Sequence, residues 1–140
     1  PEISDVIYSE SNKADITREV SNALDEAHKI VIGPSNPILS IGPILAIQNL
    51  KEKLSYSNST YVVSPFIENK AIKGPSKKNF EDLGYKSDIT GIKEFYNNIG
   101  NYYIVQSGDT DKAENTIENN ILFKSTEDST NLARYIVDHE

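Results

Sequence analysis

Residues 30–45 read Ile30-Val-Ile-Gly-Pro-Ser-Asn-Pro-Ile-Leu-Ser-Ile-Gly-Pro-Ile-Leu45. A short apolar run leads directly into a loop of glycine, proline, serine and asparagine, and the loop leads into a helical pattern. Such short apolar runs are typical of strands buried in parallel sheets. Prolines at positions 34, 37 and 43 restrict the loop to a narrow range of shapes. The stretch therefore predicts a strand, a rigid loop and a helix, the place where open α/β sheets bind ligands.

The patterns on both sides of this stretch predict a Rossmann-like α/β fold with three layers and a mostly parallel sheet. Helical spacing predicts helices over 14–28, with Asp15 as N-cap, and over 42–54; buried strands are expected over 29–33 and 60–64. A strand, a helix and a strand at this spacing predict a parallel crossover. Further elements are expected as a helix from Pro75, a helix over 89–97, a strand over 101–106, a helical turn and edge strand within 108–120, and a closing helix. The closing helix follows a capping box at Ser125–Asp128 and presents Leu132, Ala133, Ile136 and Val137 as its apolar face. We therefore expect residues 1–140 to form a single α/β domain.

Composition narrows the classes of partner. A net charge of -7 over 140 residues argues against nucleic acid or an anionic membrane as the main partner, because both select a basic surface. The chain has no cysteine and only two distant histidines, which excludes thiolate zinc sites and disfavours a His-rich metal centre. No apolar run approaches the roughly 20 residues of a membrane span, so a cytoplasmic protein is expected. The absence of methionine suggests that the chain was cut from a longer protein.

The loop after the first strand is the first candidate ligand site. Its candidate residues are Gly33, Ser35, Asn36, Pro37 and Ser40. Backbone amides at the start of a helix attract anions, glycine allows close approach, and serine and asparagine side chains can hold phosphate oxygens or base edges. The alternative is a stiff strand-to-helix turn in which Ser40 only caps the helix.

The second candidate lies after the next strand and comprises Ser64, Lys73 and Gly74. In a parallel sheet both loops end at the same edge, so the two candidates could face one crevice, with Lys73 as the charge for a diphosphate. The alternative is a solvated basic cluster, which is the favoured interpretation for Lys77 and Lys78. The acidic residues fall on expected polar helix faces, so the sequence assigns no catalytic residue and no metal ligand.

The string Ile30 to Leu45, with Val63-Ser-Pro-Phe-Ile67 and Ala71-Ile-Lys-Gly-Pro-Ser76 at the right distance, closely resembles the 2-phospho-L-lactate transferase family. The resemblance runs from about Ile3 to Asp138 and covers the C-terminal half of such enzymes. The chain is thus expected to be the C-terminal portion of a larger domain.

The resemblance implies a magnesium-assisted, phosphoryl-type transfer in coenzyme F420 biosynthesis. The ribityl hydroxyl of 8-hydroxy-5-deazariboflavin, a deazaflavin alcohol, attacks the lactyl-bearing phosphate of a guanosine diphosphate-linked donor, and GMP is released. By matching positions, Ser35, Asn36 and Ser40 would touch donor or acceptor, and Lys73 would lie near phosphate. The magnesium ligands are expected in the N-terminal half, upstream of Pro1, and the family suggests a homodimer. Phospholactyl, phosphoenolpyruvyl and phosphoglyceryl donors would use the same loops.

Two features depart from the family pattern. The family usually has Thr-Asp-Thr before its final helix, where this chain has Glu118, Asn119 and Asn120, and the segment 108–117 looks shortened. Two alternatives therefore stand beside the enzyme. One is a non-catalytic regulator that binds a nucleotide or nucleotide sugar, although distant relatives of that kind look more like Gly-Pro-Gly-Ser at this loop. The other is a structural half that folds or dimerises without binding.

Overall fold

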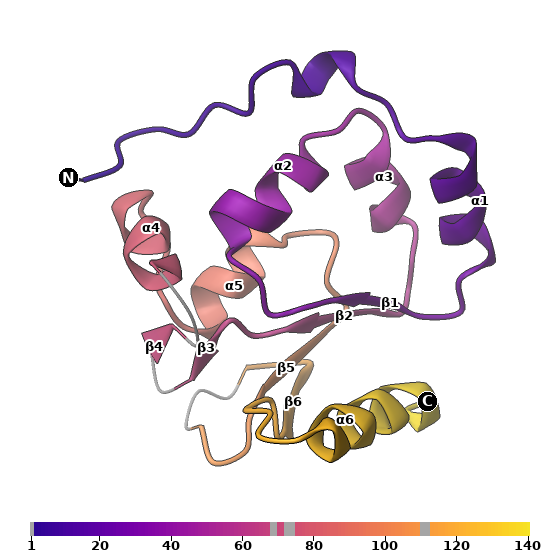
Figure 1. Cartoon of the computed structure of the whole chain (residues 1–140), viewed down its shortest axis with the longest axis vertical. Helices are drawn as coiled ribbons and strands as arrows, with labels where there is room; N and C mark the ends of the chain where they lie inside the picture. The colour runs from indigo at the N-terminus through magenta and orange to yellow at the C-terminus, as the bar shows by residue number, and fades with distance from the viewer. Residues whose placement is uncertain (1, 68–69, 72–74, 110–112) are drawn as a thin grey trace.

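Four parallel strands form the central sheet of the protein, in the order β1-β2-β5-β6 (Figure 1). A computed structural model describes residues 2–67, 70–71, 75–109 and 113–140. The strands are β1 Ile30–Ile32, β2 Thr60–Val63, β5 Tyr102–Gln106 and β6 Thr116–Asn119. Helices flank both faces of the sheet, so the predicted Rossmann-like α/β arrangement is confirmed.

Side chains alternate between the two faces along each strand. The face that carries Val62, Tyr103 and Val105 is termed the covered face. The face that carries Tyr61, Val63 and Ile104 is termed the α6 face. The helices and helical turns are η1 Ser11–Lys13, α1 Arg18–Glu26, η2 Pro37–Ile41, α2 Gly42–Leu45, α3 Leu50–Ser55, α4 Ser76–Asp82, α5 Ile89–Phe95 and α6 Thr126–Asp138.

The covered face holds the larger core. Leu50 and Leu54 of α3 and Ile92 of α5 are buried there together with the sheet residues. Phe80 of α4 is 0% exposed and packs against Phe66, Tyr85 and Phe95, with ring centroids 4.8–5.7 Å apart. Several helices therefore exclude water from this side of the sheet.

The α6 face is covered by one described helix. The capping box at Ser125 and Asp128 is present at the start of α6, as predicted. Leu132 and Ile136 are buried against the sheet, whereas Ala133 and Val137 are exposed. The predicted closing helix is therefore present, and only part of its apolar face is buried, because the rest lies beside an open groove.

The predicted helix over 42–54 is two short helices, α2 and α3. The first ends at Leu45, and Asn49, in a left-handed backbone conformation with φ 66°, is the N-cap residue of the second. Gln48 forms a parallel bridge with Asp15, and Asn49 donates to the Asp15 carboxylate. Asp15 is therefore not the cap of α1. Thr17 takes that role, accepting from the Val20 amide at 3.3 Å.

A small antiparallel hairpin lies beyond β2 and was not predicted from the sequence. Its strands are β3 Phe66–Ile67 and β4 Lys70–Ala71. Two-residue strands carry too little periodicity to be detected in a sequence. No helix in the described part of the chain is long and apolar enough to cross a membrane.

Candidate functional site

Asn36 determines the shape of the loop that follows β1. Its Oδ1 accepts hydrogen bonds from the amides of Ile38 and Leu39, both at 3.0 Å, so the side chain caps η2. Pro37, at the first position of η2, is buried. The Ser35 amide donates to the Gly33 carbonyl at 2.8 Å, which tightens the turn before the cap. The loop is therefore rigid, as predicted, and Asn36 rather than Ser40 caps the helix.

The turn that follows is a π-helix. The amides of Ser40 and Ile41 both donate to the Asn36 carbonyl, at 3.0 and 3.2 Å. Tyr8 fixes this turn from outside, because its hydroxyl donates to the Ile38 carbonyl at 2.6 Å. Burial raises the pKa of Tyr8, so the phenol stays protonated and can donate at neutral pH. A Cβ at position 42 would collide with the Tyr8 hydroxyl, which explains the glycine there.

The polar groups of the loop that remain available are side-chain donors. Ser35 and Ser40 are exposed, and no described residue accepts a hydrogen bond from Asn36 Nδ2. Gly33 is exposed, with open space where a Cβ would lie. The amides of Ser35, Ile38 and Leu39, in contrast, already have partners inside the loop. An anion at this loop would therefore contact hydroxyl and carboxamide groups, rather than the helix amides that the sequence suggested.

Ser64 ends β2 at the same sheet edge but is 3% exposed. Its hydroxyl donates to the Phe66 carbonyl at 2.9 Å and accepts from the Phe66 amide at 3.1 Å. These bonds form the turn into β3. The geometry favours a structural role for Ser64, and its contact with a ligand stays a prediction.

Lys73 and Gly74 lie outside the described residues, so their place in the site stays a prediction. The neighbouring Lys77 and Lys78 of α4 form ion pairs with Glu81 and Asp82 one turn along the same helix. The hydrogen bond from Lys78 and the one from the Ile3 amide lower the pKa of Asp82. These two lysines therefore pair with acidic residues on the surface of α4, in agreement with their interpretation as a solvated basic cluster.

The arrangement of metal-ligating side chains is a further feature of the described residues. Among residues 2–67, 70–71, 75–109 and 113–140, no three His, Asp or Glu side chains gather closely enough to hold an ion.

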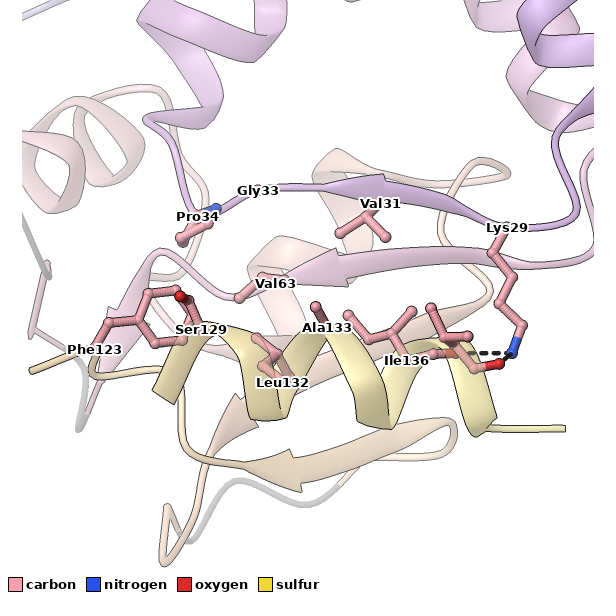
Figure 2. A pocket seen from close by; sticks show the side chains of 11 residues that line it. Lys29, Val31, Gly33, Pro34, Val63, Phe123, Ser129, Leu132, Ala133 and Ile136 are labelled. Atoms are coloured by element: carbon pink, nitrogen blue, oxygen red, sulfur yellow. Dashed lines mark hydrogen bonds between the residues drawn. The ribbon is translucent and has the colours of Figure 1, made fainter. Parts of the chain in front are cut away.

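A groove of about 450 Å³ lies between β1, β2 and α6, beside the loop (Figure 2). We term it the α6 groove. Its lining is mostly apolar and comprises Lys29, Val31, Gly33, Pro34, Val63, Phe123, Ser129, Leu132, Ala133, Ile136 and Val137. Gly33 is one of the candidate site residues and Pro34 lies in the same loop, so the groove and the loop are continuous.

Lys29 closes one end of the α6 groove. Its amine donates to the carbonyls of Ile136 and Val137, at 2.7 and 2.8 Å (Figure 2). It also donates to the carbonyl of His139. A cation at the C-terminal end of a helix offsets the partial negative charge of the free carbonyls. Because these carbonyls occupy the amine, Lys29 is poorly placed to bind a phosphate, and the groove is better suited to apolar groups.

Comparison with known proteins identifies the family of this chain. The family model described as 2-phospho-L-lactate transferase CofD matches residues 1–135. The chain belongs to this family. The enzyme named 2-phospho-L-lactate transferase from Methanococcus vannielii is 39% identical over 142 residues, and that from Methanocaldococcus jannaschii is 35% identical over 141 residues. Each alignment covers 98% of this chain.

The chain spans 45% of the length of these two CofD-family relatives. The match is consistent with their C-terminal half, as the resemblance predicted. More than half of each relative therefore lies outside the region compared, and the described site is one part of what a complete family member contains.

Two residues around the CofD-family loop were not identified from the sequence. Tyr8 precedes the turn by 30 residues and gave no local signal. Lys29 was included only as the first residue of the strand expected over 29–33, because its hydrogen-bond partners lie more than a hundred residues away. The glycine at position 42 was the available clue, since a glycine inside a helical pattern indicates close approach by another group.

Proposed function

We propose that this chain contributes the substrate-binding loops of a 2-phospho-L-lactate transferase. The enzyme would move a 2-phospholactyl or phosphoenolpyruvyl group from a guanosine diphosphate-linked donor to the ribityl hydroxyl of 8-hydroxy-5-deazariboflavin, in coenzyme F420 biosynthesis. The observation that carries the proposal is the family match over residues 1–135, which includes the whole loop from Gly33 to Gly42.

In the proposed reaction the ribityl oxygen forms a bond to the phosphorus that bears the lactyl group. The bond from that phosphorus to the oxygen shared with GMP breaks, GMP leaves, and the hydroxyl gives up its proton. Such transfers depend on positioning and on neutralising charge at the phosphate oxygens. A loop whose shape is fixed by Asn36 and Tyr8 suits this task, because little ordering is left to occur on binding.

Within this chain, Ser35, Ser40 and Asn36 Nδ2 are proposed to donate hydrogen bonds to donor or acceptor, with Pro37 holding the turn. Lys73 and Gly74 are proposed to lie near the diphosphate. Magnesium is proposed as the cofactor, with ligands from the rest of the protein. The complete enzyme is proposed to be a homodimer, the commonest soluble assembly. Water-soluble substrates of this kind favour the cytoplasm as the place of reaction.

The first test is turnover. The 140-residue chain is assayed with lactyl diphosphoguanosine, the deazaflavin alcohol and magnesium, alone and as a chimera that carries the upstream region of the Methanococcus vannielii relative. Mass spectrometry detects the phospholactyl product. Product from the chimera supports the proposal, and product from the chain alone would show that these residues suffice. A folded chimera that binds GDP without turnover would instead favour the non-catalytic regulator.

A second test examines the contribution of the loop after β1 through a substitution at Asn36. Asn36→Asp keeps the Oδ1 acceptor that caps η2, replaces the Nδ2 donor and adds a negative charge beside the expected phosphate. We expect kcat/KM of the chimera to fall by about tenfold or more, the loss of one charge-assisted hydrogen bond. Asn22→Asp, on the exposed surface of α1, adds the same charge and serves as control. Equal activity of the two variants would contradict a role for Asn36 in binding.

A further inference from the structure

The Ile38 carbonyl lies in the π turn of the loop after β1, at the point where the regular pattern of backbone hydrogen bonds stops. In a π turn a carbonyl accepts from the amide five residues ahead, and the Gly42 amide accordingly donates to the Pro37 carbonyl. The next bond of this pattern would join the amide of residue 43 to Ile38, but residue 43 is proline and has no N–H. Ile38 is 2% exposed, so little water can reach its carbonyl. This carbonyl therefore depends on a donor from elsewhere in the chain.

The Tyr8 hydroxyl is that donor, and its oxygen lies 2.6 Å from the Ile38 oxygen. A buried carbonyl without a partner destabilises a fold, so the bond removes a penalty as well as adding a contact. Without the hydroxyl, a change of register would satisfy the carbonyl. The Gly42 amide would leave Pro37 and donate to Ile38, which is the α-helical pairing of residues four apart. The π register and the α register are thus two alternatives for this turn, and Tyr8 stabilises the first.

The segment that carries Tyr8 is held in place on both sides of this residue. The Ile3 amide donates to the Asp82 carboxylate of α4 at 2.9 Å. Beyond Tyr8, the backbone at Asp15 forms a parallel bridge with Gln48, between α2 and α3. Figure 1 shows this indigo segment passing α2 and α3 on the side away from the sheet. Tyr8 is therefore presented to the turn from a fixed position.

We propose that Tyr8 is a positioning residue of the transferase, which holds the loop in the π register and thereby sets where Ser40 lies relative to Asn36. A change to the α register would move the residues between Asn36 and Gly42, and with them the exposed Ser40 hydroxyl. The inference rests on the proposed function. It adds a residue outside the loop that determines the geometry of the substrate contacts.

A turn held in one register suits a loop that has to place hydrogen-bond donors on a phosphate. π turns are rare and occur frequently at functional sites. Transfer depends closely on the position of the contacting groups, because a misplacement of about 1 Å can lower a rate about a hundredfold. Loss of the Tyr8 hydroxyl leaves Ser40 and Asn36 present but less well placed. It should therefore lower kcat more than it raises KM.

The register can be measured in the 140-residue chain without any substrate. Nuclear magnetic resonance detects couplings across N–H···O=C hydrogen bonds, and so identifies the carbonyl to which the Gly42 amide donates. We expect this carbonyl to be that of Pro37 in the unmodified chain and that of Ile38 in Tyr8→Phe. The substitution keeps the aromatic ring and removes only the donor.

Two further variants complete the comparison. Tyr56→Phe is the matched control, because Tyr56 is 71% exposed and its hydroxyl donates to Glu52 on the same helix, away from the loop. It should leave the partner of the Gly42 amide unchanged. Gly42→Ala keeps Tyr8 but places a Cβ against its hydroxyl. This change should displace the phenol and produce the same change of register as Tyr8→Phe.

Kinetics in the chimera with the upstream region of the Methanococcus vannielii relative measure the consequence for transfer. The assay is run at a temperature at which every variant is folded, so that a loss of stability alone changes neither constant. We expect Tyr8→Phe to lower kcat by about tenfold and to leave KM for lactyl diphosphoguanosine within about twofold of the parent value. Tyr56→Phe should keep both constants.

Each outcome bears on one of the two proposals. A Gly42 amide that stays coupled to Pro37 in both Tyr8→Phe and Gly42→Ala would overturn the inference. A change of register with unchanged kcat would also overturn it, because Tyr8 would then have a structural role alone. A chimera that shows no turnover before any substitution would contradict the proposed function instead, and the register in the isolated chain would then decide whether Tyr8 holds the turn.

Discussion

The covered face and the α6 face belong to the same four strands, yet they are packed to different degrees. On the covered face several helices bury Val62, Tyr103 and an aromatic group around Phe80. On the α6 face a single described helix buries Leu132 and Ile136 and leaves a groove open along β1. This difference indicates that the buried core that stabilises the chain lies mainly on the covered face, while the α6 face leaves apolar surface exposed along the α6 groove.

The largest expected effect is the difference in stability loss between two phenylalanine substitutions, one on each face. Phe80→Ala removes a ring that is fully buried among three others and should cost about 3–5 kcal/mol in the free energy of unfolding. Phe123→Ala, at 43% exposure beside the α6 groove, should cost about 1 kcal/mol or less. Urea denaturation of both variants measures the gap. Similar losses would contradict the unequal packing of the two faces.

Two buried isoleucines, one on each face of the sheet, allow a second comparison of how tightly the faces are packed. Ile92 is 1% exposed on the covered face, and Ile136 is 5% exposed beside the groove. Ile92→Ala should leave an enclosed cavity and cost about 4 kcal/mol, whereas Ile136→Ala only widens an open groove and should cost about 2 kcal/mol. The same denaturation experiment compares them. A larger loss for Ile136 would show that the α6 face is the better packed of the two.

The attachment of α6 to β1 can be weakened through Lys29. Lys29→Met keeps the aliphatic stem and removes the amine that binds the last carbonyls of α6, so the free energy of unfolding should fall by about 1 kcal/mol. Hydrogen exchange should increase selectively in the last turn of α6. Lys51→Met, on the exposed side of α3, is the control. Equal hydrogen-exchange rates in the last turn of α6 for Lys29→Met and Lys51→Met would exclude Lys29 as the residue that anchors this helix.

The smallest expected effect is a change in Tm with pH that depends on Asp128. Backbone hydrogen bonds from Lys124 and Ser125 lower the pKa of Asp128 at the start of α6. A lowered pKa means that the unfolded chain binds the proton more readily, so this stabilisation is present at neutral pH and is lost as pH falls below about 4. Asp128→Asn should therefore lower Tm at pH 7, and its difference from the parent should shrink towards pH 3. A Tm difference between Asp128→Asn and the parent that stays constant from pH 7 to pH 3 would contradict the assignment.

The sheet was predictable because its strands are short apolar runs next to strong turn signals. β1, β2 and β5 follow the expected ranges, since residues such as Val62 and Ile104 are buried whatever the details of the helices. The helices between them were less predictable. Asn49 precedes α3 in a left-handed conformation, and its side chain donates a hydrogen bond to Asp15, a residue 34 positions away that no local pattern connects with it.

The position of the loop after β1 was predicted from the sequence, but the contacts that make it rigid were not. Gly33, Ser35 and Ser40 are exposed, whereas the engaged amides and the anchoring by Tyr8 follow from contacts that no local pattern contains. The exposed side of α6 was also not foreseen. A helical pattern shows which residues are apolar, but the surroundings decide whether Val137 is buried.

The π-helical turn after Asn36 has a consequence for how the length of this loop can change over evolution. A π turn holds one residue more than an α turn, and each added residue rotates everything after it by about 100°. The glycine at position 42 faces the Tyr8 hydroxyl only because that extra residue is present. A deletion of one residue within Pro37–Ile41 would turn a side chain towards Tyr8 and release the turn. The number of residues between positions 36 and 42 is therefore coupled to the contact with Tyr8, whereas a change of an exposed side chain in the loop leaves that contact in place.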